Sequence, residues 1–159
     1  MPPQQKLAER KAGALVQEVL SEDYTGMLIV IGADTMVVKD GAILGKPRNL
    51  DDAKAMLRHL SGGPHQVITA VSVWLLAASD EENVSMAYRT FADTSTVVFR
   101  TLTDEEIAEY LKKGESFDKA GAYAIQGEGR ALVERYEGSF DTIVGLPVER
   151  LLKEFPDLR

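Results

Sequence analysis

The stretch Met27-Leu28-Ile29-Val30-Ile31-Gly32-Ala33-Asp34-Thr35 is the most informative part of this chain. Its five consecutive large apolar residues, rich in β-branching, predict a strand covered on both faces. In open α/β sheets, ligands bind outside the carboxyl ends of such strands, which is where Asp34 and Thr35 stand. Asp34 could hold a metal ion or orient a water there. The alternative is that it only opens a turn before the next apolar residues.

Composition limits the class of protein. The chain has 159 residues, 45% of them hydrophobic and 27% charged, as expected for one globular domain spanning residues 1–159. No apolar segment reaches the length of a membrane span, and the first residues do not resemble a signal peptide. The absence of cysteine excludes disulfides, thiolate nucleophiles and zinc–thiolate sites. We therefore expect a cytoplasmic protein with no membrane partner.

The formal net charge of −7 argues against a nucleic-acid partner, because such surfaces are usually basic. A small anionic substrate remains compatible with this charge, provided that lysines converge locally.

Hydrophobic periodicity and turn residues predict interleaved helices and strands. Helices are expected at residues 5–20, 51–60 (capped by Asn49), 104–114 (opened by a capping box at Thr103) and 147–154. Strands are expected at 27–33, at 36–39 and 42–44 as a hairpin around Asp40-Gly41, at 67–78 and 85–99 joined by an acidic turn at 79–82, and at 130–136. Residues 117–129 fit no pattern. The predicted fold class is mixed α/β with a substantial antiparallel component.

Lys11 has an unusual position on the first predicted helix. It lies three residues after Ala8 and four before Leu15, so it points into the apolar stripe. Either its ammonium group extends back to water beside a packed stem, or it is aimed at a cleft.

Several familiar chemistries are excluded by the residues. Gly41 and Gly45 are separated by three residues rather than four, and Pro47 follows Lys46, so this segment is not a phosphate-binding P-loop. His59 and His65 lack metal-ligand spacing, and no serine elbow is present. Carboxylate, lysine and amide groups remain, which suit a hard cation and a phosphate ester. They are Asp34, Lys46, Asp118, Lys119 and Gln126.

The order and spacing of these motifs over nearly the whole chain resemble the Maf family. The matching segments are Leu7-Ala8-Glu9-Arg10-Lys11-Ala12, Ile31-Gly32-Ala33-Asp34-Thr35, Leu44-Gly45-Lys46-Pro47, Ala55-Met56-Leu57 with Leu60-Ser61-Gly62, Asp118-Lys119-Ala120-Gly121-Ala122-Tyr123, Ile125-Gln126-Gly127 and Val144-Gly145-Leu146-Pro147.

This resemblance implies a fold related to inosine triphosphate pyrophosphatases, with a long twisted mixed sheet flanked by helices and a central cleft. It implies a cytoplasmic hydrolase of nucleotide metabolism that converts nucleoside triphosphates to the monophosphate and pyrophosphate with a divalent metal, Mg²⁺ or Mn²⁺. The Asp-Thr and Ile-Gln-Gly motifs resemble the branch acting on dTTP, UTP and modified pyrimidine nucleotides. The alternatives are the branch acting on 7-methyl-GTP, and a weakly active or inactive nucleotide-binding protein that regulates cell division. A homodimer is a further option.

Roles for individual residues also follow from the resemblance. Asp34 is expected to be the catalytic proton acceptor and a metal ligand. Thr35 and Gln126 match the positions that govern base selectivity. Lys11, Lys46 and Lys119 match family lysines near the phosphates.

One part of the family pattern has no counterpart here. The family begins with a strand and a Ser-x-Ser-Pro-Arg-Arg loop that grips the triphosphate, followed by an acidic residue of the metal site, and this sequence starts after them. We therefore expect an amino-terminally truncated domain. Either the start was placed too late or the chain was clipped, or this is a true short protein.

Overall fold

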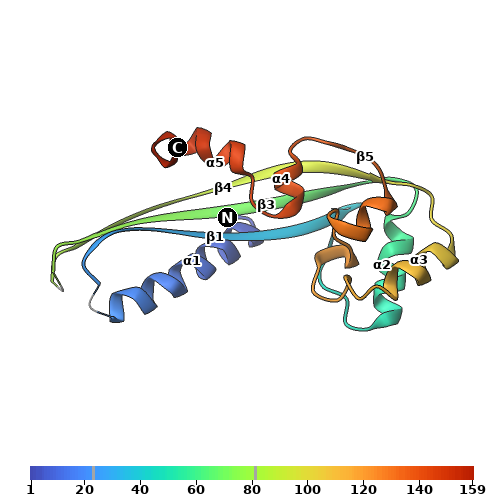
Figure 1. Cartoon of the computed structure of the whole chain (residues 1–159), viewed down its shortest axis with the longest axis horizontal. Helices are drawn as coiled ribbons and strands as arrows, with labels where there is room; N and C mark the ends of the chain where they lie inside the picture. The colour runs from blue at the N-terminus through green and yellow to red at the C-terminus, as the bar shows by residue number, and fades with distance from the viewer. Residues whose placement is uncertain (23, 81) are drawn as a thin grey trace. The chain divides into compact units, whose positions relative to one another are not determined.

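The computed structural model describes residues 1–22, 24–80 and 82–159. These residues form a five-stranded sheet in the order β2-β1-β3-β4-β5, with helices beside it (Figure 1). The elements are α1 (Pro3–Ser21), β1 (Gly26–Lys39), β2 (Ala42–Leu44), α2 (Leu50–Leu60), β3 (Pro64–Ala78), β4 (Val84–Phe99), α3 (Asp104–Leu111), β5 (Val133–Glu137), α4 (Phe140–Val144) and α5 (Val148–Glu154), with short 3-10 segments at Ala120–Ala122, Gly127–Leu132 and Pro156–Leu158. The predicted mixed α/β class is confirmed.

The chain folds as two compact units. Unit 1 consists of Met1–Asp34 and Thr69–Ala92, and unit 2 of Thr35–Ile68 and Asp93–Arg159. Strands β1, β3 and β4 each contribute residues to both units. In the described part of the chain, no helix is long and apolar enough to cross a membrane. Glu81, which belongs to the predicted acidic turn at 79–82, lies outside the described residues.

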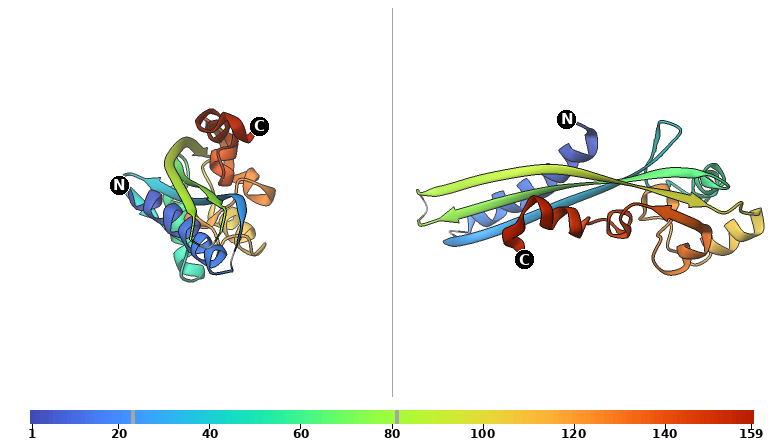
Figure 2. Two further views of the ribbon diagram at one scale, coloured as in Figure 1. Left: turned by 90° about the vertical axis from the view of Figure 1, so that its left-hand side faces the viewer. Right: turned by 90° about the horizontal axis from the view of Figure 1, so that it is seen from above.

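In unit 1, helix α1 packs against one face of the sheet, and Figure 2 shows it running beside β1. Ala8, Ala12 and Val16 are fully or almost fully buried on this face, as the period of the helix predicts, but Leu15, which was also expected on the apolar stripe, is 48% exposed. Gly32 of β1 permits the contact, because a Cβ there would lie 2.6 Å from the carbonyl oxygen of Ala8. Glycine is therefore required where the helix crosses the strand.

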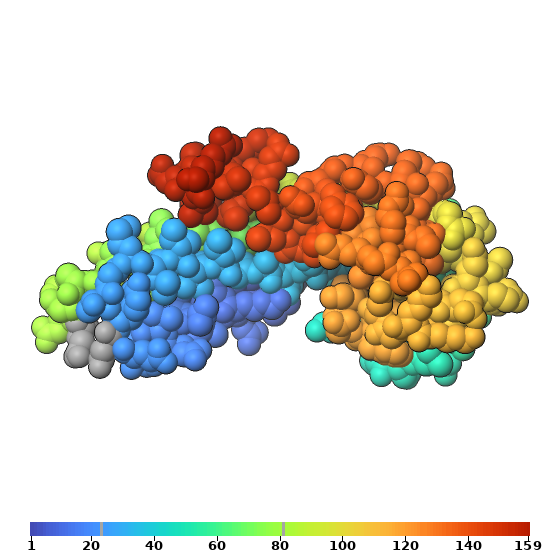
Figure 3. Space-filling model, viewed as in Figure 1, coloured from blue at the N-terminus to red at the C-terminus, as the bar shows by residue number. Residues whose placement is uncertain are grey.

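Strand β1 is not covered on both faces, so that prediction is wrong. Val30 is only 4% exposed beneath α1, whereas Met27 is 84%, Ile29 46% and Ile31 42% exposed. The alternation is that of a strand with one packed face. Part of β1 is open to the viewer in the space-filling view (Figure 3). Five apolar residues in a row therefore indicated a strand, but did not indicate how many of its faces are covered.

The only tryptophan of the sequence also belongs to unit 1. The ring of Trp74 stacks on that of Tyr88, with centroids 4.4 Å apart, and its indole N–H donates to the Ser72 hydroxyl at 2.9 Å. Trp74 also lies beside α1, where a Cβ at Gly13 would be 3.6 Å from the indole.

Unit 2 has the larger core, formed by α2, α3 and the inner residues of the strands. Leu57, Phe99 and Ile107 are fully or almost fully buried in it. The cap at Asn49 and the capping box at Thr103 form as predicted: Asn49 Oδ1 accepts from the Asp52 amide at 2.8 Å, and Thr103 Oγ1 accepts from the Glu106 amide at 3.1 Å. Local sequence therefore fixes where both helices begin.

Turns and short elements complete unit 2. The predicted hairpin is present, pairing Val37 with Leu44, and Asp40 and Gly41 take the positive φ values of 50° and 78° that such a tight turn needs. Strand β5 pairs antiparallel with β4 but begins at Val133 rather than at residue 130, because residues 130–132 complete a 3-10 segment. Helix α4 was not predicted.

Candidate functional site

Lys11 of α1 meets Asp34 of β1 in unit 1, at a point where the strand continues to Lys39 and does not end as expected. The ammonium Nζ of Lys11 lies 2.6 Å from Asp34 Oδ1 and also donates to the Ala33 carbonyl oxygen at 3.0 Å. The lysine side chain is 56% exposed, and that of Asp34 is 16% exposed. Lys11 is therefore more than half open to water while its ammonium group contacts a carboxylate, and a cleft at this position stays a prediction.

The close packing of α1 on Gly32 explains this contact. The helix touches the strand through Ala8 and Ala12, and Lys11 lies between these two positions. Asp34 is two residues beyond Gly32, so its side chain points to the same face of β1. Small residues at the crossing thus bring the ammonium group within reach of the carboxylate.

Thr35 follows Asp34 in the chain but belongs to unit 2. Its side chain is half-buried, and its hydroxyl lies 3.3 Å from the position that a Cβ on Gly145 would take. The Val144-Gly145-Leu146-Pro147 segment therefore comes close to the predicted selectivity residue. A side chain at position 145 would crowd the hydroxyl, and the backbone there has a φ of 126°.

Two predicted phosphate lysines come from neighbouring loops of unit 2. The amide of Gly121 donates to the carbonyl oxygen of Gly45 at 3.1 Å, which joins the loop before Lys46 to the loop after Lys119. Both lysines are exposed, and the Lys119 ammonium lies 3.6 Å from Asp118 Oδ2. Unit 2 thus presents two lysine ammonium groups from adjoining backbone segments.

Gln126 is exposed and precedes the 3-10 segment Gly127–Leu132. Glu115 reaches the same turn, because its Oε1 lies 3.0 Å from the position of a Cβ on Gly127. Among the described residues, the other oxygen of Glu115 is buried without a hydrogen-bond partner. Sequence reasoning missed Glu115, since residues 117–129 gave no periodicity that would fold this turn back onto it.

Comparison with known proteins identifies the family. The model of the family described as Maf-like protein matches residues 1–158. The chain belongs to this family. A relative from Bacillus velezensis is 49% identical over 154 residues, which cover 95% of this chain and 74% of the relative. One from Lachnoclostridium phytofermentans is 47% identical over 85% of the chain and 66% of the relative, and one from Clostridioides difficile is 50% identical over 77% and 60%. Each of the three is named dTTP/UTP pyrophosphatase.

The histidines of this Maf-like chain have structural positions. His65 is buried in the core of unit 2, and burial, aided by the charge of Lys39, lowers its pKa to about 4. It is therefore neutral at pH 7. His59 lies on α2, with Nε2 3.7 Å from Asp40 Oδ2 at the hairpin turn. Neither arrangement resembles a metal site.

A divalent metal would find few protein ligands in the Maf-like chain. Within residues 1–22, 24–80 and 82–159, no group of three or more His, Asp or Glu side chains could hold one. Magnesium, however, is commonly held by one or two carboxylates together with substrate phosphates and water. Asp34 fits that arrangement as the single carboxylate, although Lys11 already contacts its Oδ1.

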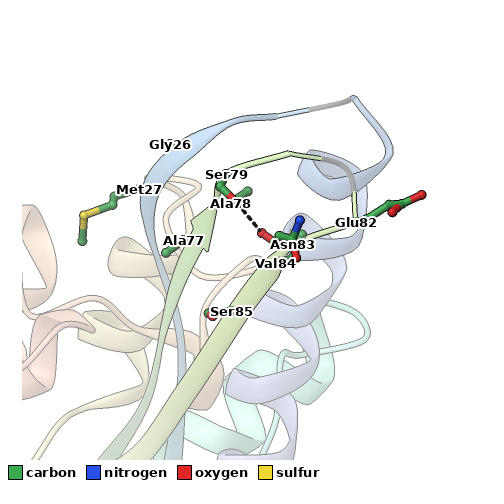
Figure 4. A pocket seen from close by; sticks show the side chains of 9 residues that line it. All are labelled: Gly26, Met27, Ala77, Ala78, Ser79, Glu82, Asn83, Val84 and Ser85. Atoms are coloured by element: carbon green, nitrogen blue, oxygen red, sulfur yellow. Dashed lines mark hydrogen bonds between the residues drawn. The ribbon is translucent and has the colours of Figure 1, made fainter.

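A depression of about 550 Å³ lies at the other end of unit 1, around Gly26, Met27 and Ser79 (Figure 4). It contains none of the predicted site residues. The amide of Ser79 donates to the carbonyl oxygen of Asn83 at 3.1 Å in this region. We attribute no chemistry to this depression.

Proposed function

We propose that this chain hydrolyses nucleoside triphosphates, dTTP and UTP among them, to the monophosphate and pyrophosphate. The observation that carries the proposal is the 49% identity over 95% of the chain with a relative named dTTP/UTP pyrophosphatase. The chain spans 60% to 74% of the three relatives' lengths, and the activity named for those relatives comes to this chain only as a proposal.

In this proposal, Asp34 is the catalytic carboxylate. Water attacks phosphorus, its oxygen forms the new P–O bond, the bond to the leaving pyrophosphate breaks, and Asp34 accepts the proton of the water. A divalent cation, Mg²⁺ or Mn²⁺, held by Asp34 and the phosphates would offset negative charge at the reacting phosphorus. The low exposure of Asp34 supports the role, because a shielded carboxylate interacts more strongly with charge than one in open water.

The three lysines contribute phosphate binding. Lys11 presents its ammonium group from α1 in unit 1. Lys46 and Lys119 present theirs from adjoining loops in unit 2. An ammonium group has three donors and no acceptor, so it suits the anionic oxygens of a triphosphate.

Gln126 and Thr35 are the proposed selectivity residues. The Gln126 amide offers one acceptor and two donors, which match the imide N–H and the carbonyl groups of uracil or thymine. The exposure of Gln126 in the free protein supports a role in binding. The Thr35 hydroxyl could add a polar contact or limit the size of the base.

The proposal is tested by pyrophosphate release from dTTP, UTP, CTP, GTP and 7-methyl-GTP in the presence of Mg²⁺. We expect dTTP and UTP to be the preferred substrates. Preference for 7-methyl-GTP would instead indicate the other branch of the family. Binding of dTTP or UTP without any release of pyrophosphate would overturn the proposed hydrolysis and favour a nucleotide-binding regulatory role.

A further inference from the structure

The Lys11–Asp34 ion pair occupies the carboxylate that the proposed reaction requires. We infer that in the nucleotide-free protein Lys11 lowers the affinity of Asp34 for divalent cations, so that a cation binds more readily together with a triphosphate than alone. This inference rests on the proposed function and assigns Lys11 a role in the order of binding.

The geometry of the pair supports this role. Lys11 Nζ lies 2.6 Å from Asp34 Oδ1, which is a short, charge-assisted contact. The same ammonium donates to the Ala33 carbonyl at 3.0 Å, so two of its three donors are engaged by neighbouring residues in the middle of β1. An ammonium group and a hard cation compete for the same carboxylate oxygen, because both interact with the lone pairs and the negative charge of that oxygen.

The exposures of the two side chains show how the pair can open. Lys11 is 56% exposed and Asp34 is 16% exposed, so an anion from solvent can reach the lysine more easily than a cation can reach the carboxylate. A triphosphate carries several negative charges, and its oxygens are stronger partners for the ammonium than one carboxylate. Once Lys11 turns to the phosphates, Asp34 Oδ1 is free to bind a cation.

The described residues contain no cluster of acidic ligands that would compete with Asp34 for a cation. In the described part of the chain, no group of three or more His, Asp or Glu side chains could hold a metal ion without substrate. Asp34 is therefore a shielded carboxylate with a lysine on it and without a cluster of further acidic ligands, an arrangement that binds bare cations poorly. When a triphosphate binds, by contrast, it supplies oxygen ligands for the cation and also draws the Lys11 ammonium group away from Asp34.

The test measures binding of Mn²⁺ alone to the nucleotide-free protein, by electron paramagnetic resonance of the unbound ion. Lys11→Met and Lys11→Gln should each bind Mn²⁺ about fivefold more tightly than the wild type, a factor in the range of measured exposed ion pairs. Lys11→Arg keeps a cation beside Asp34 and should bind Mn²⁺ as the wild type does. Adding Asp34→Asn to Lys11→Met should remove the gain.

Arg10→Met is the matched control. It removes one positive charge from the neighbouring position of α1, where the side chain is exposed. It should change Mn²⁺ affinity by less than about twofold, because solvent screens a charge that does not touch the carboxylate. A gain equal to that of Lys11→Met would show that net charge alone is responsible and would overturn the inference.

Two further results would overturn it. One is equal Mn²⁺ affinity of the wild type and both neutral Lys11 variants. The other is failure of both neutral variants to fold, since the pair would then be a structural one. Mn²⁺ binding is measured without nucleotide and so does not depend on catalysis. If the wild type released no pyrophosphate, the proposed function would be refuted, but the comparison of Mn²⁺ affinities would still stand.

Discussion

The Nε2 atom of His65 lies 2.7 Å from the hydroxyl oxygen of Tyr123, and both side chains are buried. Phe99 meets both rings edge-on, with centroids 5.1 Å and 4.7 Å away. Burial lowers the pKa of His65 to about 4 and raises that of Tyr123, so both groups are neutral at physiological pH. The Asp118–Tyr123 motif is thus tied to the core of unit 2 through its last residue.

This cluster predicts a pH dependence of stability. The pKa of His65 falls from 6.5 to about 4 on folding, so the unfolded chain binds more protons between these values. The contribution of neutral His65 to the free energy of unfolding is therefore fully present above pH 6.5. It declines as the pH falls toward 4, by up to about 3 kcal/mol. Urea unfolding of the wild type and of His65→Gln at pH 7.0 and 4.5 checks this. A wild type that loses no more stability than the variant would contradict it.

Asp34→Asn should lower kcat for pyrophosphate release by about a hundredfold or more, because the proton acceptor is lost. Steady-state kinetics with dTTP and Mg²⁺ measure the effect. Asp40→Asn is the control: Asp40 has a φ of 50° at the hairpin turn, which asparagine also tolerates, and its turnover should stay near that of the wild type. Wild-type turnover in Asp34→Asn would exclude Asp34 as the catalytic carboxylate.

Gln126→Glu should shift the preference away from dTTP and UTP, because the donor half of the amide is lost. We expect kcat/KM for UTP to fall about tenfold, the equivalent of one good hydrogen bond, with smaller changes for other bases. Glu128→Gln serves as a control on the same turn, where Glu128 pairs with Lys113 at 2.6 Å. Equal losses of kcat/KM for all four bases in Gln126→Glu would indicate a structural role.

Gly32→Ala and Gly13→Ala should have opposite effects on stability. An alanine Cβ at position 32 would lie 2.6 Å from Ala8 O and 2.7 Å from Ala12 N, so α1 must move and about 1–3 kcal/mol should be lost. At position 13 the nearest atom is 3.6 Å away, and alanine in a helix should stabilise by up to about 1 kcal/mol. Urea unfolding measures both. Equal stability of the two variants would contradict the close helix–strand contact.

Local patterns predicted most elements because the determining interactions are local. The caps at Asn49 and Thr103 and the turn at Asp40-Gly41 depend on residues three or four positions apart. Helix α4 was missed because Phe140–Val144 has five residues, too few to show a helical period. The burial of β1 depends on which distant segments pack against it, and the sequence of β1 alone does not indicate those segments.

Only part of the candidate site could likewise be predicted from the sequence. The position of Asp34 after an apolar run was visible in the sequence, and the place of Lys11 on the first predicted helix left two interpretations open. The contact between them depends on the packing of α1 against Gly32, which no local pattern encodes. The roles of Thr35, Gln126, Lys46 and Lys119 were expected only from the family resemblance, and they stay predictions.

Because Trp74 stacks on Tyr88 within unit 1, its fluorescence can be used to follow the unfolding of that unit. With one tryptophan in the sequence, all emission excited at long wavelength comes from unit 1, beside α1 and the Ser72 hydroxyl. Circular dichroism, in contrast, averages over the whole chain. If the fluorescence and dichroism transitions in urea separate, the two units melt independently; if they coincide, the strands shared by both units make the chain unfold as one cooperative body.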